Sequence, residues 1–378
     1  MKILIENASI LTMNSQKQFV QSGYLFIDKG NVISYGEGSP PLELEFADYV
    51  INESFAVALP GFVVGMGNIL HYLFQFVEDN TVFDMLSTLS RVEFETVLEV
   101  SLASLTFHGV TSVVTVVRSV DEKFLQTLAT ASTNNWTRVR AVIPISLLPT
   151  AQEYEHVVKT WFKGVVDQDA IAKRIVSLGI LIENKNDLSR LSKELVDAIN
   201  SSKTFVYIDS EVFAEGLPLT REINNIVLLN PRPQTTPCIY TSVSDWKLGC
   251  GFMSYDIGML NPRKLLPLLH KALGNAYNTV SILSHENPLN NRLGSSSIRE
   301  AEQADIVIMS FREPPHGPIP LTEHCIVNAL SNGFYTVKTV IVGGEIVFDN
   351  GLHLFVGEEK IRRAGSIISE LSRKLVAE

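Results

Sequence analysis

The sequence predicts an α/β protein: a (β/α)₈ barrel of the TIM type, trimmed or distorted late in the chain, plus a small β-sandwich module built from both chain ends. Two patterns predict this arrangement. Eight short β-rich runs alternate mostly with helical stretches in the middle of the chain, and hairpin patterns occupy both ends. The length of 378 residues, with 46% apolar and 19% charged residues, suffices for both parts and excludes a disordered chain.

The chain ends carry the strand and turn signals of the module. Apolar runs at 24–27 and 32–36 flank the turn residues at 28–31, which indicates a hairpin. Near the C-terminus, a strand at 305–309 precedes a second hairpin with the turn Gly343-Gly344, and a helix follows over 358–376. We therefore assign residues 1–57 and 303–378 to the β-sandwich module and residues 58–302 to the barrel domain.

The middle of the chain supplies the barrel strands. The β-rich runs span residues 61–65, 111–117, 139–146, 175–183, 204–210, 225–230, 237–241 and 247–252. A helix predicted over 91–107 ends at Gly109, a residue type that tolerates a left-handed cap. Only six residues separate the sixth run from the seventh, and five the seventh from the eighth. Parallel crossovers need a dozen or more residues, so we expect a trimmed or distorted barrel.

Charge and cysteine content exclude several classes of protein. With 31 Lys and Arg against 41 Asp and Glu, the net charge is −10, which argues against nucleic acid or an anionic membrane as the main partner. Three cysteines without a CxxC pair indicate a reduced, cytoplasmic protein. The N-terminus has no apolar run long enough for a signal peptide. The uncharged segment 54–77 contains Pro60 and Gly61, which favours a buried strand and loop over a membrane span.

Four segments carry a resemblance to a known family. They are the N-terminal strands, the run ALPGFV at 58–63, the run FHGVTSVV at 107–114, and the pair ADIVI at 304–308 with VKTVIVGGEIV at 337–347. In this order and spacing the chain resembles the amidohydrolase superfamily, in particular its cytosine deaminase and chlorohydrolase-like branch. The resemblance implies the barrel fold and a divalent metal. That metal is held by a His-x-His pair after the first strand, histidines from the fifth and sixth strands, and an aspartate from the eighth, and it activates a water.

The metal-ligand motifs of that family are missing here. The His-x-His positions fall on Met66 and Asn68, and the chain contains no His-x-His. The fifth strand places Ile208 at the histidine position and Glu211 at a glutamate position, and Gly251 or a neighbour replaces the aspartate. A thioether, an amide and an isoleucine do not form a zinc or iron site. We therefore expect no cofactor, and a divalent metal only if the site has been relocated.

Three residues are candidates for catalysis without the family's metal site. His71 follows the first strand, near the barrel mouth, while Asp209 and Glu211 alternate with Tyr207 along the fifth strand and share a face. Together they could act as general acid and base. The alternatives stay open: His71 satisfied by a backbone carbonyl, and the carboxylates serving as helix caps or solvated loop charges.

Further residues are assigned to the pocket or to structural roles. Met66, Asn68, Tyr207 and Glu183 are expected to line the pocket, Glu183 because it ends the fourth strand. Cys250 could be a nucleophile, although a small buried residue is the simpler interpretation. His108 is expected to complement the dipole of the helix that ends beside it.

Two hypotheses follow. In the first, the chain is an amidohydrolase-fold protein that lost its metal centre, a non-catalytic or metal-independent homologue that binds a small molecule, forms a homo-oligomer or pairs with an active relative. In the second, it is an active hydrolase of non-peptide carbon–nitrogen bonds, an amidohydrolase or deaminase that uses His71, Asp209 and Glu211.

Overall fold

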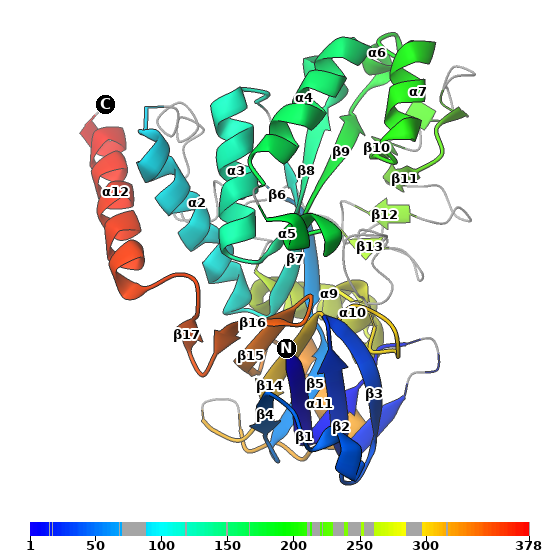
Figure 1. Cartoon of the computed structure of the whole chain (residues 1–378), viewed down its shortest axis with the longest axis vertical. Helices are drawn as coiled ribbons and strands as arrows, with labels where there is room; N and C mark the ends of the chain where they lie inside the picture. Colours follow the sequence, from blue (N-terminus) through cyan, green and yellow to red (C-terminus); the bar gives the residue numbers. More distant parts are fainter. Residues whose placement is uncertain are drawn as a thin grey trace. The chain divides into compact units, whose positions relative to one another are not determined.

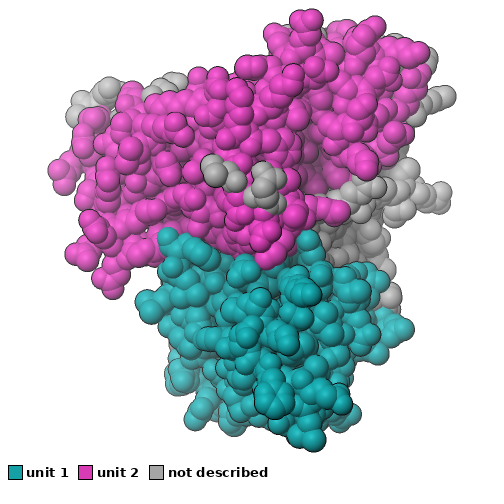
Figure 2. Space-filling view, viewed as in Figure 1, with its two compact units in different colours: residues 1–64, 104–112, 261–355 teal, residues 65–103, 113–260, 356–378 magenta. Residues whose placement is uncertain are grey.

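The fold comes from a computed structural model of the chain (Figure 1). The residues that the structure describes are 1–14, 16, 18–67, 69, 88–117, 119–148, 150–165, 167–209, 212–213, 220, 222–229, 238–240, 251–252, 261–284, 297–314 and 317–377. They form a mixed α/β fold with two compact units (Figure 2). Unit 1 consists of Met1–Val64, Ser104–Ser112 and Asn261–Phe355, and unit 2 of Gly65–Ala103, Val113–Leu260 and Val356–Glu378. The domain boundaries proposed from the sequence stay a prediction.

Unit 1 contains a nine-stranded sheet that takes strands from both chain ends. The strands are β1 (Lys2–Leu11), β2 (Phe19–Asp28), β3 (Asn31–Glu37), β4 (Tyr49–Asn52), β5 (Ala56–Pro60), β14 (Ile306–Ser310), β15 (Thr336–Val342), β16 (Glu345–Asp349) and β17 (Leu352–His353). Their order is β17-β16-β15-β14-β5-β1-β2-β3, with β4 paired to β1. The antiparallel pair β14–β5 joins the two ends of the chain. That this sheet forms a sandwich stays a prediction.

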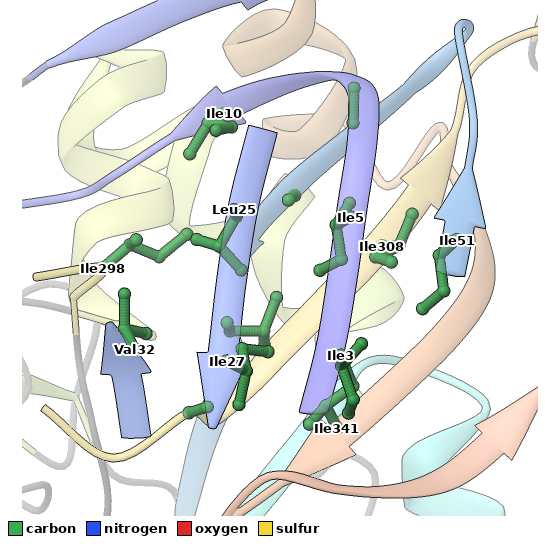
Figure 3. Close-up of a cluster of buried hydrophobic side chains, with 14 of the residues drawn as sticks. Ile3, Ile5, Ile10, Leu25, Ile27, Val32, Ile51, Ile298, Ile308 and Ile341 are labelled. Carbon is green, nitrogen blue, oxygen red and sulfur yellow. The ribbon is translucent and has the colours of Figure 1, made fainter. Parts of the chain in front are cut away.

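Alternating apolar residues of these strands form one core. Figure 3 shows side chains such as Ile5, Leu25 and Ile308 clustered between the strands. The alternation follows from the strand period of two, which turns every second residue to the same face. Each such buried Ile or Leu contributes about 2 kcal/mol by leaving water. Burial of this apolar face is therefore what holds the first and last strands of the chain together.

In unit 1, the glycines of two turns meet beside one buried carboxylate. Both predicted hairpins form, with positive φ at Lys29 and Gly30 and at Gly343 and Gly344. A Cβ on Gly344 would lie 2.4 Å from the Gly30 Cα, so this contact requires a glycine. The Asp305 carboxylate, 1% exposed, accepts the Gly343 N–H at 2.7 Å.

Backbone hydrogen bonds extend this junction to the start of the second sheet. The Ala304 N–H donates to the Gly30 carbonyl at 2.8 Å, and the Gly61 N–H donates to the Asp305 carbonyl at 3.0 Å. The Phe62 N–H donates to the Gly109 carbonyl at 2.9 Å. Three helices complete unit 1 and contact one another: α9 (Pro262–Leu273), α10 (Ala276–Ile282) and α11 (Glu323–Ser331).

The second sheet has eight strands in chain order, most of whose residues belong to unit 2. They are β6 (Phe62–Gly67), β7 (Val110–Val116), β8 (Arg138–Pro144), β9 (Val176–Ile182), β10 (Phe205–Asp209), β11 (Ile226–Leu229), β12 (Cys238–Tyr240) and β13 (Gly251–Phe252). Each predicted run overlaps one of these strands. The pairings from β8 to β13 are parallel, including those of the two short late strands. Within the described residues no pairing joins β13 to β6, so closure into a barrel stays a prediction.

Helices alternate with the strands of unit 2 as the sequence predicts. They are α2 (Arg91–Thr106), α3 (Glu122–Asn134), α4 (Ala151–Lys163), α5 (Gln168–Ala172), α6 (Lys185–Leu188), α7 (Lys193–Ser201) and α12 (Glu358–Ala377), with short 3₁₀ turns at Leu42–Leu44 and Ile145–Leu147 elsewhere in the chain. Gly109 follows α2 with the expected positive φ. Among the described helices none is long and apolar enough to cross a membrane.

The C-terminal helix α12 packs against α2. Apolar contacts join Val356 and Ala364 to Val100 and Ala103. The Lys360 ammonium contacts the Glu99 carboxylate, whose side chain is 1% exposed. The Asn134 amide of α3 donates to the same carboxylate at 2.9 Å. These contacts are with helices of unit 2, and the assignment of this helix to the domain built from the chain ends stays a prediction.

Breaking the Lys360–Glu99 pair should destabilise the protein. In a Lys360→Met variant, Glu99 keeps its burial but loses its cation, and we expect a loss of about 2 kcal/mol in the free energy of unfolding. Urea unfolding followed by circular dichroism measures it. Lys374→Met on the same helix removes an exposed pair with Glu370 and should change stability by less than about 0.5 kcal/mol. Equal effects of both substitutions would contradict this assignment.

Two histidines, the half-buried His108 and the buried His353, should make unit 1 sensitive to acid. Burial, then the charges of Arg263 and Lys264, lowers the pKa of His108 to about 4, and burial lowers the pKa of His353 to about 4. The expectation that His108 complements a helix dipole is therefore wrong, because its ring is neutral at pH 7.

Between pH 6.5 and 4 these two rings are protonated in the unfolded chain but not in the folded chain. The free energy of unfolding therefore has its full value above pH 6.5. It falls towards pH 4 by about 1.4 kcal/mol per pH unit for each ring. Unfolding midpoints measured from pH 7 to 4.5 should show this slope, and it should flatten in the His108→Gln and His353→Gln variants. His156→Gln, an exposed residue on α4, should leave the slope unchanged.

Candidate functional site

The predicted site residues on β10 follow the alternation of a regular strand. Tyr207 and Asp209 are two residues apart, so they share one face, as predicted. The register pairs Tyr207 with Leu181 of β9, and Leu181 with Pro144 of β8. The same face of β8 and β9 carries Arg140 and its partner Ser177.

A buried arginine occupies this face and holds Tyr207. The Arg140 guanidinium, 1% exposed, donates to the Tyr207 hydroxyl at 2.9 Å and to the Ser177 hydroxyl at 3.2 Å. Its Cζ lies 4.3 Å from the centre of the Phe205 ring, a cation–π contact. We call Arg140, Ser177, Phe205 and Tyr207 the Arg140 cluster. Arg140 pairs with Ser177 early in these strands, so the Tyr207 hydroxyl reaches toward the amino ends of the strands and away from Asp209.

A glycine makes room for the cluster. A Cβ on Gly179 would lie 2.9 Å from the Tyr207 ring and 3.1 Å from a Val142 methyl group. Because protein interiors are close-packed, the small residue on β9 and the large residues on its neighbours fit together as a set. Tyr207 is therefore a packed, hydrogen-bonded core residue.

The opposite face of these strands is aliphatic. It presents Val139, Ala141, Ile143, Val176, Leu178, Ile180, Ile182, Val206 and Ile208, all buried. Ile208, which stands at the histidine position implied by the resemblance, thus points away from the face that carries Tyr207 and Asp209. Only one of the two faces of β10 can line the interior of a barrel, so Ile208 and Tyr207 cannot both do so.

The other predicted residues fall in two groups. His71, Asn68 and Glu211 lie outside the described residues, as does Cys250, and for Met66 and Asp209 only the strand backbone is described. The catalytic assignment of His71, Asp209 and Glu211 therefore stays a prediction. Glu183 is described and exposed at the start of α6, where its backbone N–H donates to the Asp187 carboxylate at 2.9 Å. Asn184 is the N-cap of this helix and Asp187 completes its capping box, so the expectation that the Glu183 side chain lines a pocket stays a prediction.

None of the described histidines belongs to a strand of the eight-stranded sheet. His108 follows α2, His156 is on α4, His270 on α9, His324 on α11 and His353 on β17. Within the described residues no group of three or more His, Cys, Asp or Glu side chains could hold a metal ion. Zinc in hydrolases needs three protein ligands from nitrogen, sulfur or carboxylate groups, so the described residues do not fit a zinc site.

Removing the Tyr207 hydroxyl should weaken the core. Tyr207→Phe keeps the ring but leaves one Arg140 N–H without that acceptor, and we expect a loss of about 2 kcal/mol in the free energy of unfolding. Chemical denaturation measures it. Tyr49→Phe is the matched control, because its hydroxyl bonds Asp349 at an exposed position, and it should cost less than about 0.5 kcal/mol. A neutral Tyr207→Phe would show that the hydrogen bond in the cluster is dispensable.

Comparison with known proteins gives matches in structure. No protein-family model matches the chain, and no curated protein sequence does. Solved structures match over nearly the whole chain. A triazine hydrolase variant has a TM-score of 0.72 and 12% identity, over 97% of this chain and 99% of that chain. Atrazine chlorohydrolase from Arthrobacter aurescens, complexed with zinc, has a TM-score of 0.70 and 12% identity, over 97% and 100%.

A third structure extends the likeness to deaminases. An adenosine deaminase from Xanthomonas campestris with bound zinc has a TM-score of 0.68 and 13% identity, over 98% of both chains. At such identity a structural match reports the course of the backbone and leaves the site chemistry to be argued from the residues. The chain has the fold of the amidohydrolase superfamily.

Proposed function

We propose that this chain is an amidohydrolase-fold protein that has lost the metal centre and acts without catalysis, by binding a small molecule or an active relative. One observation carries the proposal. The eight strands β6 to β13 contain no histidine, one carboxylate (Asp209) and one cysteine (Cys238). Metal-dependent hydrolysis needs several such ligands at one end of the sheet, because the metal must lower the pKa of a bound water.

The Arg140 cluster supports the same proposal. Arginine stays protonated at any physiological pH, so a permanent positive charge lies on the face shared by Tyr207 and Asp209. Coulomb repulsion in a weakly screened interior disfavours a second, divalent cation near it.

The proposal includes the barrel and the setting in which the protein acts. The consecutive order of β6 to β13, with parallel pairing from β8 to β13, is that of a TIM barrel, in which ligands bind at the carboxyl ends of the strands. A net charge of −10 suits a small ligand or a protein partner in the cytoplasm better than nucleic acid or a membrane.

Metal content tests the proposal directly. We expect the purified, untagged protein to retain less than about 0.1 equivalent of metal after incubation with Zn²⁺, Fe²⁺, Ni²⁺ or Mn²⁺ and dialysis, measured by inductively coupled plasma mass spectrometry. A zinc-bound adenosine deaminase of the same fold, treated in parallel, should retain about one equivalent.

Retention of about one equivalent by this chain, with turnover of an amide or amidine, would overturn the proposal. Turnover without metal would instead favour the hydrolase that uses His71, Asp209 and Glu211. In that case Asp209→Asn and Glu211→Gln should abolish the activity, and unchanged turnover in both variants would exclude those two carboxylates.

A further inference from the structure

A polar pocket lies in unit 1, outside the eight-stranded sheet. It has a volume of 660 Å³ and is formed by the segment after β1, the start of β2, the end of β3 and residues 299–300. Sites for small organic ligands have volumes of about 300–1,000 Å³. The pocket therefore has the size of a ligand site, and nothing in the proposed function uses it.

Its amide groups are held in place by one another. The Gln18 side-chain carbonyl accepts from the Tyr35 hydroxyl at 2.9 Å and from the Asn14 amide at 3.3 Å. Asn14 is only 4% exposed, and its own carbonyl accepts the Gln16 N–H at 3.0 Å. Because two donors occupy the Gln18 carbonyl, the NH₂ group, with two N–H donors, is the end of this amide that a ligand would meet.

The lining combines apolar side chains with two charged ones. Phe19 and Val20 line the pocket, and Val20 and Tyr35 also pack against the buried core. Arg299 and Glu300 line it as well. The Arg299 guanidinium donates to the Ser297 hydroxyl at 3.1 Å and pairs with the Glu302 carboxylate at 2.6 Å, so its charge is compensated within the protein. An anionic ligand would therefore gain little from Arg299 and would meet the Glu300 carboxylate, which favours a ligand without negative charge.

We propose that this pocket binds a neutral cyclic polyol, such as a sugar. A sugar ring has an apolar C–H face that can lie against Phe19 and Val20. Its hydroxyl groups both donate and accept, which matches the Gln18 N–H donors and the acceptor oxygens of Tyr35 and Glu300. Burial and the Glu300 charge raise the pKa of Tyr35, so the phenol stays protonated and keeps Gln18 oriented at neutral pH.

Saturation-transfer difference NMR with maltose tests this inference on the full chain. We expect saturable binding with a dissociation constant of about 1 mM, and at least about tenfold weaker binding by Gln18→Leu, the loss for one or two hydrogen bonds. Tyr35→Phe removes one acceptor and one of the two donors that hold the Gln18 carbonyl but keeps the Gln18 N–H donors, so it should weaken binding less. Gln152→Leu, on the exposed surface of α4, is the matched control and should bind as the parent does.

Each variant is first shown to unfold at the parent's midpoint, so that lost binding is not lost folding. No saturable signal with maltose, methyl glucoside or inositol up to about 50 mM would overturn the inference. So would equal affinity in Gln18→Leu and the parent. Saturable binding of cytosine in place of the sugars, lost in Gln18→Leu, would assign the pocket to planar bases and overturn the polyol class.

Discussion

The junction around the buried Asp305 carboxylate is the constraint on which the scaffold depends. One short segment, Ala304–Asp305, bonds the Gly30 turn near the N-terminus, the Gly343–Gly344 turn near the C-terminus and Gly61 at the start of the second sheet. Each of these groups is a backbone N–H or carbonyl that would be costly to bury alone. Because the junction satisfies them together, segments about 300 residues apart in sequence are fixed by a few hydrogen bonds.

This junction explains why the family resemblance survives in the sequence. Gly61 and Phe62 come from the run ALPGFV, Gly109 and Thr111 from FHGVTSVV, Gly30 from the N-terminal strands, and the other members from ADIVI and VKTVIVGGEIV. A Cβ on Gly61 would lie 2.1 Å from the Thr111 methyl group, so these two runs also touch. The motifs that carry the resemblance are therefore contacts of one structural centre. They report on folding, and they say nothing about chemistry.

The strands and turns could accordingly be predicted from the sequence, whereas the Arg140 cluster could not. All eight strands of the second sheet and both hairpins could be predicted, because the β-rich runs and the glycine turns are local signals. The Arg140 cluster could not, since the bond from Arg140 to Tyr207 joins residues 67 positions apart and depends on strand register. The neutral state of His108 could not be predicted for the same reason. The burial of its ring comes from tertiary packing, whereas the sequence predicts only the helix end beside it.

The scaffold contacts and Met66 lie at opposite ends of β6. Phe62 begins β6 and Val110 begins β7, while Met66, at a position where the resemblance implies a metal ligand, is near the end of β6. In barrels of this type the amino ends of strands serve stability and the carboxyl ends carry chemistry. Substitutions at Met66 or Asn68 therefore leave the Asp305 junction intact. A chain built in this way can vary the residues at the carboxyl ends of its strands at little cost in stability, so one fold can carry different chemistries.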